Sequence, residues 1–393
     1  MDFKLTEEQL MIQRAAREFA QQQCLPGVIE RDEHQKFPKE QMEQLADLGF
    51  LGMMASTEYG GAGMDTISYV IAMEEISKVD ASVSVAMSVN NSLVCWGLEH
   101  YATEEQKKKY LTPLAQGKKD GALYIGAFLL SEPEAGSDAT HQHTSAIDKG
   151  DHYLLNGVKN WITNGSTASV YLVMAQTDAS KGPKGINAFI VEKNTPGILV
   201  GAKENKLGIR GSDTHAVSFM DVKVPKENRI GADGFGFSFA MKTLNGGRIG
   251  IAAQALGIAS GAYELALAYS KQRQSFGKPI HEHQAIQFKL AEMATRIQSA
   301  RLLCYHQSAR LLCYHAAWEK DNGLDYTTSA AMAKLHASDT AMWAATEAVQ
   351  VHGGYGFVKE YHVERLMRDA KITQIYEGTS EIQKMVIGRN ITK

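Results

Sequence analysis

The spacing of apolar residues changes twice along the chain, and the order of these changes limits the folds available. To about residue 120 the sequence carries helix-start signals, including the TEEQ segments at Thr6 and Thr103, whose spacing predicts capping boxes. Between about 122 and 232, short runs rich in Val, Ile, Tyr and Phe alternate with turn sequences and predict antiparallel strands. From Phe235 onward, long Ala- and Leu-rich stretches with helical periodicity return.

This order predicts an α+β architecture with three domains: an N-terminal helical domain (1–121), a middle antiparallel β domain (122–232) and a C-terminal helical domain (233–393). It lacks the alternating βαβ units that a doubly wound nucleotide-binding sheet needs. The segment YGGAGMD at Tyr59 does not have G-x-G-x-x-G spacing, so we interpret it as a turn rather than a phosphate site.

Composition excludes several classes of function. The 393 residues, 44% of them hydrophobic, can bury a large core. The 41 basic and 44 acidic residues give a formal charge of −3 without a basic stripe, so nucleic acid is not an expected partner. The start, MDFKLTEEQL, has no signal-peptide pattern, and we expect a cytoplasmic protein without membrane insertion. The four cysteines have no CxxC spacing, and no metal site is expected.

The segment KITQIYEGTSEIQ (371–383) places a single carboxylate, Glu377, directly before a glycine. Glu377 is either a cap for the helix that follows or a general base. Thr379 is a natural N-cap for that helix, so Glu377 is not needed there. We expect the apolar neighbours Ile375 and Tyr376 to desolvate the carboxylate and raise its pKa, and Gly378 to let a ligand approach the backbone.

Five segments in order resemble the acyl-CoA dehydrogenases, and among them the short-chain, butyryl-CoA branch most closely. They are LLSEPEAGSDA (129–139), NGVKNWITNG (156–165), RQSFGKPIHEHQ (273–284), QVHGGYG (350–356) and RDAKITQIYEGTSEIQ (368–383). The resemblance spans essentially the whole chain. It implies an N-terminal helical domain, a middle β domain and a C-terminal four-helix bundle, in agreement with the periodicity.

The resemblance implies FAD-dependent dehydrogenation of acyl-CoA thioesters to trans-2-enoyl-CoA, as in fatty acid β-oxidation. Glu377 matches the family's base for the Cα proton, and a hydride passes from Cβ to flavin N5. Because a thioester α proton is only weakly acidic, its removal needs a positioned carboxylate. Some branches place the base one residue before the arginine that is Arg248 here. Gly247 stands at that position, which supports Glu377 and disfavours isovaleryl-CoA.

The resemblance also implies two sets of FAD-binding residues. The first matches positions around the flavin ring, although Trp161 taken alone is more often a core residue. It comprises Phe128, Leu130, Ser131, Trp161, Ile162 and Thr163. Gly136, Ser137, Thr379 and Glu381 are expected as further FAD contacts. The second matches positions that hold the adenosine pyrophosphate of a neighbouring subunit's FAD, and implies a homotetramer built as a dimer of dimers. It comprises Arg273, Phe276, Gln284, Gln350, Gly353 and Gly354. For Arg273 a solvated helix face remains the alternative.

Substrate contacts are implied in the same way. Ser137 and Arg248 match residues near CoA, whereas Asn245 stands where relatives usually have Asp, which weakens one charge-assisted bond. Gln254 resembles the short-chain branch, in which a bulky polar residue blocks the pocket floor. Tyr376 and Gly378 complete the expected substrate contacts.

An electron-transferring flavoprotein is the implied acceptor of the electrons. Two alternatives stay open: an oxidase-like enzyme that passes electrons to oxygen, and a non-catalytic scaffold with the same fold. Two segments also depart from the family pattern. DGALY (120–124) lengthens the connection into the flavin strand, and SARLLCYH occurs twice, at 299–306 and 308–315. Copies nine residues apart face opposite sides of a helix, so we expect one copy to pack in the bundle and the other to be absorbed by a break, a bulge or an overhang.

Overall fold

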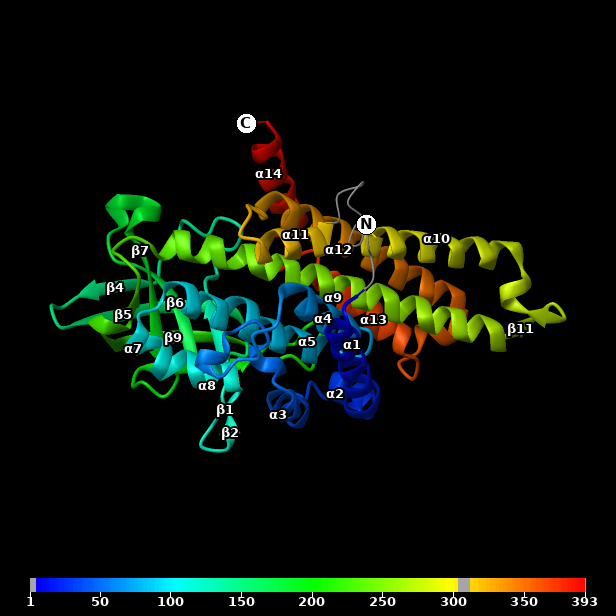
Figure 1. Cartoon of the computed structure of the whole chain (residues 1–393), viewed down its shortest axis with the longest axis horizontal. Coiled ribbons are helices and arrows are strands. Elements are labelled where there is room, and N and C mark those ends of the chain that lie inside the picture. Colours follow the sequence, from blue (N-terminus) through cyan, green and yellow to red (C-terminus); the bar gives the residue numbers. More distant parts are fainter. Residues whose placement is uncertain (1–4, 303–311, 393) are drawn as a thin grey trace.

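The computed structural model describes residues 5–302 and 312–392, and its helices and strands follow the predicted order (Figure 1). Two capping boxes begin N-terminal helices as predicted: Thr6 pairs with Gln9, and Thr103 with Gln106. The N-terminal helices are α1 (Glu7–Phe19), α2 (Val28–Glu33), α3 (Lys39–Asp47), α4 (Thr66–Ser77), α5 (Ala81–Ser88), α6 (Trp96–Tyr101), α7 (Glu104–Gln106) and α8 (Thr112–Gln116). A π-helical segment, η4 (Val89–Cys95), joins α5 to α6.

The middle of the chain forms an eight-stranded sheet within the described residues, ordered β10-β7-β6-β4-β5-β9-β8, with β3 paired to β6. Its strands are β3 (Gly126–Leu129), β4 (Ser145–Asp148), β5 (His152–Thr163), β6 (Val170–Gln176), β7 (Ile186–Glu192), β8 (Ile198–Lys203), β9 (Thr214–Pro225) and β10 (Arg229–Ile230). The pairing is antiparallel as predicted except where β3 and β4 run parallel to β6. The chain leaves the sheet after β3 in a long loop, and such a connection permits parallel neighbours.

The DGALY segment forms part of a small surface hairpin. Strands β1 (Lys118–Lys119) and β2 (Ala122–Leu123) pair across Asp120 and Gly121, whose φ angles are 52° and 78°. Two successive left-handed residues are typical of a tight hairpin turn. The hairpin projects away from the sheet, and β3 still pairs with β6 (Figure 1). The extra length is therefore accommodated at the surface.

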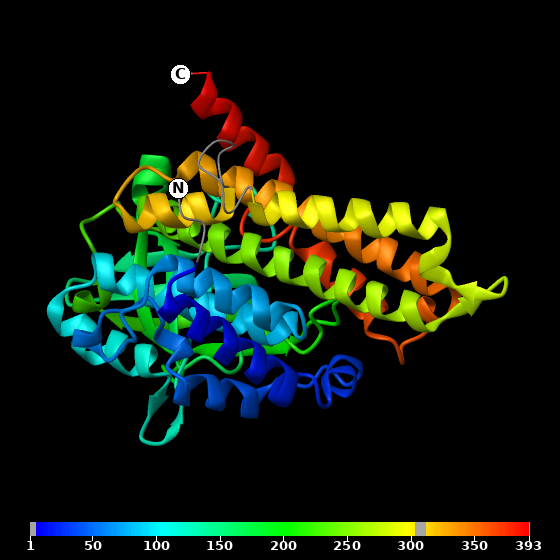
Figure 2. The same ribbon diagram turned by 45° about the vertical axis from the view of Figure 1, so that its right-hand side comes forward.

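Long helices dominate the C-terminal part and form the predicted bundle. They are α9 (Gly236–Gln272), α10 (Gln284–Leu302), α11 (Leu312–Asp321), α12 (Thr327–His352), α13 (His362–Ile372) and α14 (Ser380–Ile391). Helices α9, α10 and α12 lie lengthwise beside one another and run away from the sheet toward the hairpin of β11 (Gln274–Ser275) and β12 (Lys278–Pro279) (Figure 2). Half of the residues of the SARLLCYH repeat lie outside the described residues, so its packing stays a prediction.

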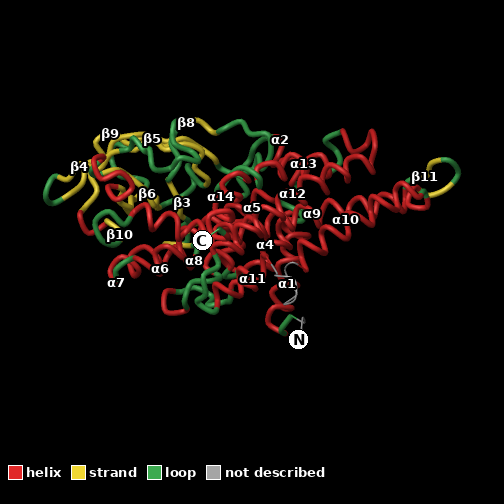
Figure 3. Tube along the Cα trace, turned by 90° about the horizontal axis from the view of Figure 1, so that it is seen from above, coloured by secondary structure: helices red, strands yellow, loops and turns green. Residues whose placement is uncertain are grey.

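Helix α9 is apolar enough on all sides to be a core helix. Among the described helices it is the one that meets the length and composition of a membrane span, and 72% of that apolar window is buried inside the protein. It packs against α4, α12 and α10, and its first turns reach the sheet. Figure 3 shows the strands of the eight-stranded sheet gathered at one end of the molecule and β11 at the opposite end, with helices between them. The three predicted domains therefore meet around the N-terminal half of α9.

Candidate active site

A cavity of about 670 Å³ lies where the N-terminal helices, the sheet and the bundle meet. Valines and a leucine of α5 and η4 form one wall, and the ends of β3 and β5 with the loop after β3 form another. Helices α9 and α14 and the loop between α13 and α14 form the rest. Twelve of the residues predicted from the sequence line this cavity: Phe128, Leu130, Ser131, Gly136, Ser137, Trp161, Ile162, Thr163, Arg248, Tyr376, Glu377 and Gly378. Its volume is within the usual range of ligand and cofactor pockets.

Trp161 reaches the cavity because β5 bulges at this point. The pairing of β5 with β9 shifts register between Lys159 and Ile162, and Trp161 has φ 56°, which is uncommon outside glycine. A bulge turns side chains away from the regular alternation of a strand. The Trp161 indole is consequently 54% exposed at the cavity rather than packed in the core. The structure therefore favours the cofactor-wall interpretation over the core interpretation.

A buried ion pair supports the loop that borders the ring side of the cavity. Lys159 and Glu132 are both almost fully buried, with 2.7 Å between Lys159 Nζ and Glu132 Oε1. Lys159 Nζ also donates to the Leu130 carbonyl at 3.0 Å and to Gln142 Oε1 at 2.9 Å. Burial lowers the pKa of Lys159 to about 8, although Glu132 opposes this shift. The pair fixes the backbone on both sides of Ser131 against β5.

Glu377 lies in a short loop between α13 and α14, in a backbone conformation that two buried side chains hold. Glu377 has φ 51° and Gly378 has φ 94°. Lys334 Nζ on α12 donates to the Gly378 carbonyl at 2.6 Å. Gln383 Nε2 donates to the same carbonyl at 2.8 Å and to the Glu377 carbonyl at 3.3 Å. Left-handed residues other than glycine are often found at functional sites, where the surroundings hold them in place.

The Glu377 carboxylate is enclosed and free to accept a proton. Its Oε2 atom is buried and accepts no hydrogen bond from the described residues. Burial raises the pKa of Glu377 to about 7, while the positive charges of Lys334 and Arg248 oppose the rise. The predicted rise is thus present, but one predicted cause is wrong. Ile375 is 48% exposed, so it does not desolvate the carboxylate as expected from its place in the sequence.

Gly247 on α9 makes room for this carboxylate. A Cβ atom added at Gly247 would overlap the Oε2 atom of Glu377 and would also press on Leu93. A carboxylate at position 247 and the Glu377 carboxylate would therefore occupy the same space, the first reaching it from α9 and the second from the loop between α13 and α14. One chain can use only one of these two positions.

Arg248 and Gln254, two of the residues expected to contact substrate, occupy different places on α9. Arg248 lines the cavity and donates from Nη1 to Asn245 Oδ1 at 2.5 Å, while Asn245 Nδ2 donates to Thr327 at 3.0 Å. Asn245 thus lies beside the cavity, behind Arg248. Gln254 is fully buried behind Tyr376, whose hydroxyl donates to Gln254 Oε1.

Gln254 is itself anchored to the N-terminal helices. Its Nε2 donates to the Ala81 carbonyl at 2.9 Å and to Ser84 Oγ at 3.2 Å. Because Tyr376 lines the cavity and is bonded to this anchored amide, the cavity is closed at that end by a fixed polar contact.

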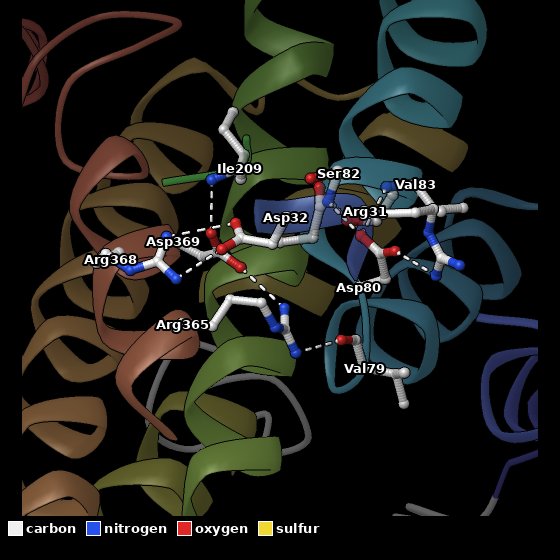
Figure 4. A network of polar contacts seen from close by, with 12 residues as sticks. Arg31, Asp32, Val79, Asp80, Ser82, Val83, Ile209, Arg365, Arg368 and Asp369 are labelled. Atoms are coloured by element: carbon white, nitrogen blue, oxygen red, sulfur yellow. Dashed lines mark hydrogen bonds and ion pairs between the residues drawn. The ribbon is translucent and has the colours of Figure 1, made fainter. Parts of the chain in front are cut away.

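A second polar network, shown in Figure 4, holds α13, the helix that leads into the Glu377 loop. Asp369 accepts from the Ile209 amide at 2.5 Å and from Arg365 at 3.0 Å, and Arg365 donates to the Val79 carbonyl at 2.7 Å. Arg368 pairs with Asp32 at 2.7 Å. Burial raises the pKa of Asp369 to about 6. The network joins α13 to both the N-terminal helices and a loop of the middle domain.

Six predicted cofactor residues lie far from the cavity. Arg273 and the turn after α12 come together at the far end of the bundle, where the Arg273 guanidinium lies 5.5 Å from the centre of the Tyr355 ring. Along the continuous helix α9, Arg248 and Arg273 are about seven turns, or about 37 Å, apart. Phe276 in the β11–β12 hairpin is 95% exposed and has φ 51°. The distant set comprises Arg273, Phe276, Gln284, Gln350, Gly353 and Gly354.

Thr379 and Glu381 belong to α14 rather than to the cavity wall. Thr379 is the N-cap of α14 and accepts from the Ile382 amide at 3.3 Å, as its sequence position predicts. Glu381 lies exposed in the first turn. Cavity contacts on this helix come instead from Ile382, Met385, Val386 and Arg389.

Three buried charged residues that support the site were not predicted from the sequence: Lys334, Lys159 and Glu132. Lys334 and Lys159 are fully buried, and lysine is almost never buried without a polar partner. For Lys334 the sequence does contain an indication: it is a lone lysine inside the Ala-rich stretch SAAMAKLHA, where helical spacing predicts a buried face. Their partners are distant in sequence, so the pairing itself was not predictable from periodicity.

Comparison with known proteins gives matches over nearly the whole chain. The model of the acyl-CoA dehydrogenase N-terminal domain matches residues 6–118, and that of the middle domain matches residues 127–222. The model of the C-terminal domain matches in two pieces, 234–308 and 306–392, which overlap inside the SARLLCYH repeat.

Individual relatives are similar over their full length. A short-chain specific acyl-CoA dehydrogenase of Clostridium acetobutylicum is 50% identical, covering 100% of both chains. The structure of butyryl-CoA dehydrogenase from Megasphaera elsdenii matches with a TM-score of 0.95 and 48% identity, covering 100% of both chains. A chain from work on the electron transferring flavoprotein of Acidaminococcus fermentans and flavin-based electron bifurcation matches with a TM-score of 0.95 and 49% identity, also covering 100% of both chains.

Proposed function

The chain belongs to the acyl-CoA dehydrogenase family, and from this premise we propose that it dehydrogenates short-chain acyl-CoA thioesters to trans-2-enoyl-CoA with Glu377 as the base. The position of Glu377 is the observation that best supports its role as the base. Its Oε2 atom is buried at the cavity and accepts no hydrogen bond from the described residues, and its pKa is raised to about 7. A general base is most effective when its pKa is near the working pH.

In the proposed reaction, Glu377 removes the Cα proton of the bound thioester. The carboxylate accepts the proton at Oε2, where no other hydrogen bond has to be broken first. Arg248 and Lys334 keep enough positive charge nearby for the ionised form to be populated near neutral pH. A bound flavin supplies the hydride acceptor for the hydrogen that leaves Cβ.

The cavity suits a flavin as its cofactor. Trp161 offers a half-exposed aromatic ring, Ser131 and Thr163 offer small hydroxyl groups at the ends of β3 and β5, and Phe128 adds an apolar surface. This set would hold a planar heterocycle by stacking and by short polar contacts. We assign the cofactor as FAD because of the residues at the far end of the bundle, where an arginine and close-approach glycines suit a pyrophosphate.

That second set supports an oligomer. A dinucleotide in the cavity of one chain cannot reach Arg273 of the same chain, which lies about 37 Å further along α9 than Arg248. A neighbouring chain must therefore supply this set, as it would in a homotetramer built as a dimer of dimers. An electron-transferring flavoprotein is the proposed electron acceptor, and the cytoplasm is the proposed location.

The closed end of the cavity favours short acyl chains. The Gln254 amide is fixed by three contacts behind Tyr376, so additional methylene groups would have to displace a buried hydrogen-bonded pair. Within a tight pocket one methylene group changes specificity by about 10- to 200-fold.

A chain-length series tests this proposal. We expect kcat/KM to be highest near C4 and at least about tenfold lower at C12. As the matched variant, Gln254→Ala opens the closed end and should move the optimum to longer chains. Turnover should require an added electron acceptor; rapid peroxide formation with oxygen alone would instead identify an oxidase. A flat series, or an optimum above C8 in the unaltered protein, would contradict the short-chain assignment.

A further inference from the structure

Lys334 is a buried cation close to the base but bonded to the backbone beside it. It projects from α12, is fully buried, and donates from Nζ to the Gly378 carbonyl at 2.6 Å. None of the ion pairs found among the described residues uses Lys334. A buried ammonium group without a paired carboxylate costs stability, so an ordinary packing role would be filled better by an apolar residue.

Gln383 provides an internal comparison. It is also fully buried, and its Nε2 donates to the same Gly378 carbonyl at 2.8 Å and to the Glu377 carbonyl at 3.3 Å. The loop backbone is therefore already held by a neutral donor. What Lys334 adds beyond this hydrogen bonding is its charge.

The charged groups around Glu377 come from two helices. Lys334 faces it from α12 and Arg248 from α9, and both stabilise the ionised carboxylate. On its own loop Tyr376 is held neutral, because burial raises its pKa well above the usual value. Leu93 of η4 and Gly247 contribute no charge. Glu377, Asp339 and Glu381 in turn favour the charged form of Lys334, whereas Arg248 and burial oppose it.

From this geometry we propose that Lys334 is a positioning residue for the reaction, which holds the loop of the base through the Gly378 carbonyl and supplies the charge that keeps Glu377 ionised near neutral pH. The inference rests on the proposed function, in which Glu377 removes the Cα proton. Burial lowers the pKa of Lys334 to about 8, above the value of about 7 for Glu377, so Lys334 is charged on the acid side of the Glu377 titration, where the test is made. Removing its charge must raise the pKa of Glu377, because an opposite charge nearby lowers a carboxyl pKa.

The test compares Lys334→Gln with Gln383→Leu. Lys334→Gln keeps an amide that can donate a hydrogen bond but removes the charge, whereas Gln383→Leu removes a hydrogen-bond donor to the same carbonyl and leaves the charge unchanged. The readout is the exchange of the Cα protons of butyryl-CoA in D2O, followed by NMR with the flavin previously reduced. This exchange reports on Glu377 without the hydride step.

The exchange rate should rise with pH as Glu377 ionises, and we call this rise the acid limb of the pH profile. In Lys334→Gln we expect the acid limb to shift to higher pH by about one unit, so that the rate below pH 6 is about tenfold lower. In Gln383→Leu the rate falls but the limb stays in place. An unchanged limb in Lys334→Gln, or an equal shift in both variants, would overturn the proposal. If the unaltered protein exchanges no Cα proton at any pH, the proposed function itself fails, and the two failures are distinguishable.

A second pair of variants guards against misfolding of Lys334→Gln. Lys334→Arg retains the charge and should keep the limb near its original position, whereas Lys334→Met should move it upward. The opposite order, or no difference between these two variants, would also overturn the proposal.

Discussion

Replacing Glu377 by glutamine is expected to lower turnover of butyryl-CoA by roughly 10³-fold, because a positioned general base contributes on the order of 10²- to 10⁴-fold. The amide has nearly the same shape as the carboxylate but cannot accept the Cα proton. Its effect on the fold should be small, because Glu377 Oε2 accepts no hydrogen bond from the described residues that the substitution would break. Steady-state kinetics with a dye acceptor measure the loss.

The pH dependence provides a control for this substitution. In the unaltered protein the rate should rise with pH through about 7, since Glu377 has to be ionised to act and burial raises its pKa to about that value. The residual activity of Glu377→Gln should lack this limb, while flavin content and thermal stability stay unchanged. Near-normal turnover in a homogeneous preparation would show that the base lies elsewhere.

The second large effect concerns sites shared between chains. Glu377→Gln removes the base from a chain's own cavity. Arg273→Glu reverses a charge at the far end of the bundle, and it should weaken flavin retention at least about tenfold because it opposes a pyrophosphate. Each variant alone should therefore be nearly inactive, for different reasons.

Two chains that complete each other's sites should regain about half of the original activity when one chain of the pair carries each variant, and a tetramer that also contains unmixed pairs should regain proportionally less. In such a pair, one cavity has an intact Glu377 and receives an intact Arg273 from the other chain, while the second cavity lacks both. Co-expression with two affinity tags and purification through both yields the mixed protein. If each chain instead formed a complete site by itself, the mixed oligomers would stay as inactive as the parents.

The elements that the sequence predicted well are those specified by neighbouring residues. The capping boxes at Thr6 and Thr103 and the N-cap at Thr379 need only a side chain and an amide three residues away. The change from helical to strand periodicity likewise reflects a local alternation of apolar residues. The exception within the sheet, the parallel pairing of β3 with β6, depends on a long loop whose path no local pattern specifies.

The site itself was predictable only in part for the same reason. Glu377 was found through its motif, but the expected contribution of Ile375 was wrong, since the exposure of a loop side chain depends on where α9 and α12 lie. The Lys334 contact with Gly378 joins residues 44 positions apart, and Asp369 contacts Ile209 across 160 positions. Such contacts follow from the packing of whole domains. The predicted domain limits, at residues 121 and 232, remain predictions.

Anaerobic titration with butyryl-CoA tests the central claim most directly, namely that this cavity brings a flavin and the Glu377 carboxylate to one short acyl-CoA. The protein is purified with its flavin, and the absorbance of the oxidised flavin is followed as the thioester is added. We predict that the absorbance is lost rapidly in the unaltered protein and only very slowly in Glu377→Gln with equal flavin content. Undiminished absorbance with every acyl-CoA from C4 to C8, in protein shown to hold flavin, would contradict the account.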